Sequence, residues 1–462
     1  MRHFLTAAAT VVACAWATPA FADTAPASRE VQSAVDAYLA SSKADAGLVG
    51  GAGQAGYDGG FWIRGGSFLM KINLTLQARW EGFDWSETNN EAAPGGDLSG
   101  FSLPRATLKF SGDATCDIHY YAELEFGHSG TFGDNSALND SDSFSLVFDD
   151  WNGFGVVNEN RREQIDYGIA REAWIEWEAC PQAAFRMGLI KTATTRQLMV
   201  APEMQQFADI SLASAFIGQT MPGYSDRNRD YGFMVHGALG CDGAWQYLVT
   251  VTNGDGPVKR NVLDGTTGDN VALSARLNWD IKGHIGYEEG ALKGHECDWA
   301  LAVGAWAYYY ADPLQHNGYA KYADRLTWGA DAAFVWGGLS ATAAYSAVSW
   351  DDENSAITPL IEEGYCWLAQ VGYLFPGTAW EIAARYSAIQ FNHYFTSLDD
   401  VSTEYGFAVT YYIDGHADKV TLDVAFIQGD DNGNAIGDVY AGYNPTYQDD
   451  GTLIRLQWQL AL

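Results

Sequence analysis

Four basic residues stand close together between positions 191 and 229, and they are the best candidates for binding chemistry in this chain. They are Lys191, Arg196, Arg227 and Arg229. A guanidinium group holds carboxylate or phosphate oxygens in a fork, and an ammonium group attracts them as a point charge. Both act most strongly where water is partly excluded, so these four residues are candidate anion-binding groups.

The same stretch contains acids and an unusual number of apolar residues. The acids, which could cancel the basic charges, are Glu203, Asp209, Asp226 and Asp230. The apolar residues are Met199, Val200, Met204, Phe207, Ile210, Leu212, Phe216 and Ile217. Because a connecting segment in water gains nothing from so many apolar side chains, we expect residues 192–230 to pack against a protein surface.

No sequence pattern typical of catalysis or of a metal site is present. The chain has no G-x-S-x-G, H-E-x-x-H or P-loop motif, and no serine is marked out near His119 and Glu123. The stretch GDDNGNAIGD, 429–438, has ligand-type residues at alternate positions but lacks the glycine and the final glutamate of a calcium loop. A solvated turn explains it better, and we expect neither an enzyme nor a metal or other cofactor.

Alternation with a period of two shows which elements must position these residues. In MKINLTLQARW, 70–80, every odd position is polar and every even position is apolar or small, as in a strand with one wet face. About sixteen such segments, roughly nine to twelve residues long, recur to the C-terminus. The apolar phase carries almost no charge, with Arg171 as the doubtful position. A soluble β-sandwich would bury this face in protein, whereas a membrane barrel would present it to lipid.

Aromatic residues and connection lengths favour the membrane barrel. Trp and Phe residues beside the short turns, and Trp, Tyr and Phe residues near the opposite strand ends, form two belts on the apolar phase. Short turns alternate with long polar connections, which is the asymmetry of outer-membrane barrels. The sequence therefore predicts an all-β fold, a transmembrane antiparallel β-barrel of about sixteen strands in the bacterial outer membrane, with both termini on the short-turn, periplasmic side.

The N-terminal part predicts export followed by a short periplasmic region. Residues 1–22 have a basic start, an apolar run and an A-x-A site, which indicates a signal peptide. Residues 23–60 contain a short helical stripe and a Gly-rich linker, and the stripe could instead be a partly ordered tail. The barrel is expected over 61–462, with 192–230 folded inward as a constriction.

Charge and cysteine usage agree with this location. The formal net charge is -32, so nucleic acid is not expected as a partner. Cys14 leaves with the signal peptide, and an oxidising compartment favours disulfides between the remaining cysteines. Cys116 and Cys180 flank neighbouring strands and are predicted to bond, as are Cys241 and Cys297, which leaves Cys366 free inside a strand.

Four stretches carry a family resemblance. LPRATLKFSG, REAWIEW, FRMGLIK, and the part from APEMQQFADISLASAF to RNRDYGFMVHG resemble the phosphate-selective porin O and P family, within a similarity that runs from Gly60 to Leu462. The resemblance implies a homotrimeric, sixteen-stranded porin in outer-membrane lipid. It also implies a loop folded into the lumen and basic residues that guide anions.

Strand parity predicts which charged residues line such a lumen. The basic ones are Lys71, Arg79, Arg105, Lys109, Arg186, Arg276, Arg385 and Arg455. The acidic ones include Glu123, Glu125, Glu172, Glu176, Asp331, Glu381 and Asp423. Since neither sign dominates and the outer loops are acidic, two kinds of pore stay open. One passes phosphate or other anions, and the other passes small hydrophilic solutes generally, with a weak or cationic preference. A structural, acidic surface barrel with a closed lumen is a further alternative.

Overall fold

The computed structural model describes residues 53–85, 98–126, 146–149, 153–156, 170–219, 228–240, 243–254, 271–292, 298–311, 324–351, 363–392, 399–428 and 451–462. The chain divides into two compact units, Met1–Ala55 with Arg64–Gly66, and Gly56–Ile63 with Ser67–Leu462. The predicted signal peptide and helical stripe lie outside the described residues. Within the stretch predicted as linker, Gln54–Tyr57 forms strand β1, and β2 follows at Phe61–Gly65.

The larger unit is built from long antiparallel strands. They are β3 Phe68–Trp85, β4 Leu98–Asp113, β5 Ile118–Glu125, β8 Ala170–Cys180, β9 Ala183–Lys191, β10 Arg229–Leu239, β11 Trp245–Thr252, β12 Val271–Lys282, β13 Ala300–Ala311, β14 Asp324–Trp336, β15 Leu339–Asp351, β16 Glu363–Leu374, β17 Trp380–Asn392, β18 Asp399–Asp414, β19 Asp418–Gln428 and β20 Gly451–Ala461. A separate hairpin pairs β6 Leu146–Asp149 with β7 Gly153–Val156.

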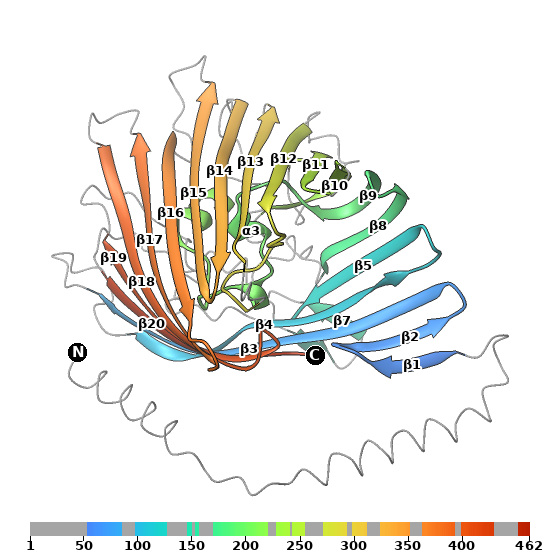
Figure 1. Ribbon diagram of the computed structural model, residues 1–462, viewed down its shortest axis with the longest axis horizontal. Coiled ribbons are helices and arrows are strands. Elements are labelled where there is room, and N and C mark those ends of the chain that lie inside the picture. The colour runs from blue at the N-terminus through green and yellow to red at the C-terminus, as the bar shows by residue number, and fades with distance from the viewer. Residues whose placement is uncertain are drawn as a thin grey trace, which may run out of the picture. The chain divides into compact units, whose positions relative to one another are not determined.

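These sixteen strands close into a barrel. Each pairs with the next one along the chain, with β5 pairing directly to β8 (Figure 1). The last strand, β20, pairs with β3 along its whole length, from Gly451 opposite Trp85 to Ala461 opposite Thr75. Closure leaves no barrel strand with an unpaired edge, as a sheet in lipid requires. The predicted sixteen-stranded antiparallel barrel is confirmed.

Successive residues of a strand face opposite sides of the barrel wall. On β8 and β9, the apolar residues Ile175 and Met187 are 64% and 65% exposed, while the adjacent Glu176 is 8% exposed. Exposed aromatic residues gather at both strand ends, with Trp177, Trp279, Trp336 and Trp380 beside the short turns and Trp328, Tyr405 and Phe426 in the opposite half. An apolar exterior with two aromatic belts contacts lipid, so this is an outer-membrane barrel.

Local backbone geometry follows the sequence at two informative positions. Gly337 and Gly338 form the two-residue turn between β14 and β15 with φ of 53° and 90°, which suits glycine and a tight hairpin. Arg171, the doubtful position of the apolar phase, lies at an irregularity where Glu123 pairs with Glu172 but Leu124 pairs with Ala170. This bulge turns Arg171 away from lipid, and its guanidinium lies 3.2 Å from Glu123.

Helices are few and short. The described helices are α3 Arg196–Met199, the 3-10 turn η1 Pro202–Met204 and α4 Leu212–Gln219, and all three belong to the segment after β9. None of the helices in the described parts of the chain could span a bilayer.

Candidate functional site in the barrel lumen

The segment that follows β9 lies inside the barrel. Residues 192–218 of it are almost entirely buried, and α3 lies within the curve of the strands in Figure 1. Its backbone amides donate to lumen-facing side chains of widely spaced strands. These bonds are Ala193 to Ser274 at 2.9 Å, Arg196 to Asp331 at 2.9 Å, Ala208 to Asp423 at 2.9 Å, Leu212 to Glu404 at 2.7 Å and Ala213 to Ser387 at 3.1 Å.

Apolar side chains hold the second half of this inner segment against one side of the lumen. Leu212, Phe216 and Ile217 of α4 pack into a buried cluster with side chains of β13, β15, β16 and β17, including Trp306, Tyr308, Val348, Cys366, Leu368 and Ile389. Burial of apolar surface inside the barrel gives the segment a hydrophobic attachment as well as a polar one. This packing accounts for the apolar composition that distinguishes 192–230 from the other connections.

Charges are neutralised across the contact between the inner segment and the barrel wall. Glu203 of the segment pairs with Lys109 of β4, and Asp209 lies 3.4 Å from Arg79 of β3. Burial alone would raise the pKa of Glu203, but Lys109 outweighs burial and lowers that pKa. Glu203 and Asp209 therefore face cations of the wall, and not the arginines of the segment itself.

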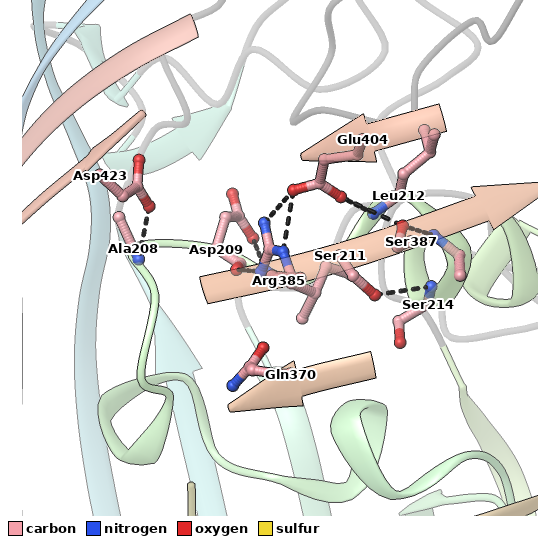
Figure 2. Close-up of polar contacts among 12 residues, drawn as sticks. Ala208, Asp209, Ser211, Leu212, Ser214, Gln370, Arg385, Ser387, Glu404 and Asp423 are labelled. Atoms are coloured by element: carbon pink, nitrogen blue, oxygen red, sulfur yellow. Dashed lines mark hydrogen bonds and ion pairs between the residues drawn. The ribbon is translucent and has the colours of Figure 1, made fainter. Parts of the chain in front are cut away.

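The wall carries further ion pairs beneath the segment. Arg385 pairs with Glu404, whose other oxygen accepts from the Leu212 amide, and Arg385 also donates to the Asp209 carbonyl at 2.9 Å (Figure 2). Arg276 pairs with Asp331 at 2.6 Å, and Arg455 pairs with Asp423 at 2.7 Å. At each of these pairs, the carboxylate serves both a wall arginine and a segment amide, so wall and segment form one network.

A second segment also reaches into the lumen, and strand parity did not anticipate it. It follows β12, and its residue Glu289 is 4% exposed. The Glu289 carboxylate accepts from Gln197 Nε2 at 2.8 Å, from the Gln206 amide at 2.9 Å and from Gln370 Nε2 at 3.1 Å. Its own amide donates to the Met204 carbonyl at 3.0 Å. Glu289 therefore connects the segment after β12 to the inner segment and to β16.

The four candidate anion-binding residues lie in different surroundings. Lys191 and Arg229 are opposite each other on β9 and β10; Lys191 donates to the Met199 carbonyl at 3.2 Å, and Arg229 lies 3.6 Å from Glu172. Arg196 donates to the carbonyls of Gly286 and Glu288, and burial lowers its pKa despite the opposing effect of Asp331. Arg227 lies outside the described residues, as does Asp226.

The remaining predicted lining residues divide by burial. Arg79, Arg276, Arg385, Arg455 and Glu123 are buried in the contacts described above, whereas Arg105, Lys109, Arg186 and Glu125 are partly exposed and Lys71 is exposed at the short-turn end of β3. Glu404 was not among the predicted lining residues, although it shares the polar phase of its strand with Ser402 and Thr410. Glu289 had no such signal, because its segment has no strand period.

A different arrangement occupies the lumen wall close to the short turns, from β4 to the end of β12. We call it the short-turn arc, and its members are Asp113, His119, Glu176, Glu178, Arg186, His236, Asp280 and His284. His119 Nδ1 lies 2.7 Å from Asp113, and its Nε2 lies 3.3 Å from Glu178. Glu176 lies 2.7 Å from both Arg186 and His236, and His284 lies 2.6 Å from Asp280.

Members of the arc keep contact with solvent. The side chains of His119 and His236 are 25% and 27% exposed, and that of Arg186 is 19% exposed. The Arg186 guanidinium also lies 3.7 Å from the ring centroid of Trp174, which stacks with Tyr121 on its neighbouring strand. The arc is therefore a partly wet surface of charged and aromatic groups. Among the described residues, no cluster of metal-ligating side chains is found.

The predicted disulfides need correction. Cys116, in the turn between β4 and β5, and Cys180, at the end of β8, are both free and exposed. The structure does not form the predicted bond between them, and the β5–β8 ladder ends at Ile118 opposite Trp177, before it reaches either cysteine. Cys366 is free and buried against the inner segment, as expected. Cys241 and Cys297 lie outside the described residues.

The fold is similar to those of solved outer-membrane proteins. The high-pH structure of Pseudomonas putida OprB aligns with 85% of this chain and 94% of that chain, with a TM-score of 0.51 and 11% identity. The outer-membrane-expressed OmpT of Vibrio cholerae aligns with 87% of this chain and 100% of that chain, with a TM-score of 0.50 and 9% identity. An anion-selective porin from Comamonas acidovorans aligns with 85% of this chain and 99% of that chain, with a TM-score of 0.49 and 11% identity.

Sequence comparisons add no closer relation, since no family model and no curated protein matches the chain. At identities near 10%, structural similarity establishes the shared barrel fold and leaves function to be argued from the lumen. The sixteen-stranded barrel implied by the resemblance is confirmed, and porin function with phosphate selectivity stays a prediction.

Proposed function

We propose that this protein is an outer-membrane porin that allows small hydrophilic solutes and ions to diffuse passively, with a preference for cations. The observation that carries the proposal is the asymmetry of the lumen. The inner segment buries the wall residues that it contacts, while the short-turn arc keeps charged side chains partly exposed near the short turns. A polar, partly wet wall inside a closed barrel is the arrangement of a water-filled pore.

The preference for cations follows from how the lumen charges are paired. Arg79, Arg276, Arg385 and Arg455 each lie against a carboxylate, which reduces their attraction for a passing anion. The described residues of the short-turn arc include four carboxylates and one arginine, so acids are in excess there. Such an excess raises the local concentration of cations.

Phosphate selectivity, which the family resemblance implies, has less support. Lys191 and Arg196 donate to backbone carbonyls of the lumen segments, and Arg229 lies against Glu172. An anion would have to compete with these partners. Assembly as a homotrimer remains an expectation drawn from the resemblance.

The test is conductance of the purified protein in planar lipid bilayers, with the reversal potential measured in a KCl gradient at pH 8. We expect stable ion conductance, a potassium permeability several-fold above that of chloride, and no block by added phosphate. The Arg229→Ala variant should likewise show no block by phosphate, because Arg229 lies against Glu172 and is not available to an anion.

Two outcomes would contradict the proposal in different ways. Phosphate block that disappears in Arg229→Ala would favour an anion-selective porin. A correctly folded barrel with no conductance would remove the transport function and leave a structural barrel with a closed lumen.

A further inference from the structure

The three histidines of the short-turn arc share one arrangement. Each has a ring nitrogen within 2.7 Å of a carboxylate oxygen: His119 faces Asp113, His236 faces Glu176, and His284 faces Asp280. The acceptors lie on different strands, so the contacts recur along the wall and do not belong to one local motif. Imidazole is the side chain whose charge ordinarily changes between about pH 5 and pH 8.

The arc lies on the path that the proposed function requires. Its strand members are within a few residues of the short turns on β4, β5, β8, β9, β10 and β12, in the same phase as the lumen-facing residues Glu123 and Arg276. His284 lies in the segment that follows β12. The histidines are also reachable by water, since His284 is 68% exposed and the other two about a quarter exposed. Protons can therefore exchange with the lumen.

Protonation would change the electrostatic character of the arc. Asp113, Glu176, Glu178 and Asp280 carry four negative charges against the single positive charge of Arg186. With neutral histidines the described arc is therefore negative by three charges, and with three imidazolium ions it is neutral. His119 shows the geometry most clearly, because both of its ring nitrogens lie near carboxylates, Nδ1 2.7 Å from Asp113 and Nε2 3.3 Å from Glu178.

Several charged groups on the elements around the arc are paired, whereas Lys71 at the short-turn end of β3 is exposed. Towards the long loops, Arg171 lies 3.2 Å from Glu123, and Arg229 lies 3.6 Å from Glu172. At the turn after β12, Lys282 lies 3.0 Å from Asp298. Carboxylate, ammonium and guanidinium groups ordinarily ionise outside the range from pH 5 to pH 8. Among the named members of the arc, the histidines are the side chains of the type whose charge ordinarily changes in this range.

We propose that His119, His236 and His284 determine the ion selectivity of the lumen, making it cation-preferring at alkaline pH and close to non-selective at acidic pH. This inference rests on the proposed porin function and adds the residues that set its preference. The effect is a change in lumen charge and needs no movement of the backbone. Organic cations should enter more readily than organic anions of equal size at pH 8 and lose that advantage at pH 5.

The experiment compares the potassium-to-chloride permeability ratio at pH 8 and pH 5 in planar bilayers, using the full chain. For the wild type we expect the ratio to fall about threefold on acidification, the scale expected for three screened charges near an aqueous path. In the triple variant His119→Gln, His236→Gln, His284→Gln the ratio should stay at its pH 8 value. The matched control is His416→Gln, which removes a histidine from the turn before β19, outside the arc, and should keep the wild-type response.

Each outcome has a distinct meaning. A wild-type ratio that does not change with pH, or a triple variant that responds like the wild type, overturns this inference while the porin function stands. Absence of conductance from the folded wild type overturns the porin function and this inference together. If the triple variant fails to fold, His284→Gln alone decides, since that exposed side chain can be replaced safely; it should retain about two thirds of the response, and a full response would count against the proposal.

Discussion

The two sides of the lumen are built from strands with the same alternation, yet their charges are in different physical states. On the side of β14–β20, which we call the packed wall, Arg385, Glu404, Arg455 and Asp423 have side chains at most 2% exposed. In the short-turn arc, Arg186 and the histidines keep about a fifth or more of their side chains in solvent. Alternation decides which way a residue faces, and packing of the inner segment decides whether its charge is screened by water.

This difference has an energetic side. A buried ion pair stabilises little in total but is costly to break, because the remaining partner keeps an uncompensated charge. An exposed ion pair contributes little to stability, and breaking it costs little, since water solvates the remaining charge. Removing a charge from the packed wall should therefore lower the free energy of unfolding strongly. Removing a charge from the arc should lower it little.

The largest expected effect comes from breaking a pair in the packed wall. Arg385→Met leaves Glu404 buried without its cation, and we expect the free energy of unfolding in lipid vesicles to fall by about 3–5 kcal/mol. Urea titration followed by tryptophan fluorescence measures this loss. The double variant Arg385→Met, Glu404→Leu should be less affected than the single one, and equal losses would show that the charge is not what matters.

An intermediate effect is expected where the two lumen segments meet. Glu289→Gln removes a carboxylate that accepts three hydrogen bonds, and the amide that replaces it has a single acceptor oxygen. We expect a loss of about 1–3 kcal/mol in the same unfolding measurement. Glu178→Gln in the arc is the matched control and should change the stability little; a comparable loss there would remove the distinction between the two sides.

The smallest effect on stability is expected in the arc. Arg186→Met breaks the pair with Glu176 and the contact with Trp174, and we expect a loss of at most about 1 kcal/mol. The same change removes the single arginine of the arc, so the cation preference measured by reversal potential should increase. A large loss of stability without a change in selectivity would show that Arg186 belongs with the packed wall.

The sequence predicted the barrel because alternation and aromatic belts are local patterns repeated many times. Parity also indicated that Arg276, Arg385 and Asp331 belong to one wall phase. It could not indicate their partners, because Asp331 and Glu404 bind amides of a segment more than a hundred residues away in sequence. Contacts of this range depend on the closed barrel and leave no periodic signal.

The burial of Glu289 and the absence of a Cys116–Cys180 disulfide could not be predicted from strand patterns. The segment after β12 has no strand period, and nothing in GHIGYEEGAL, 283–292, distinguishes a buried Glu289 from a solvated one. The Cys116–Cys180 prediction used the adjacency of strands β5 and β8, which is correct. A disulfide also needs facing side chains, and neighbouring strands do not guarantee that.

The bonds between the inner segment and the wall also bear on how the barrel assembles. A strand that slips by one residue turns its lumen residues towards lipid. Asp331, Glu404 and Asp423 offer a check, because each reaches a segment amide only when its strand is correctly placed. Hydrogen bonding to the segment therefore distinguishes the native register of strands β14, β18 and β19 from a shifted one. A misassembled barrel would lack these bonds and could be recognised by a loose, protease-accessible interior.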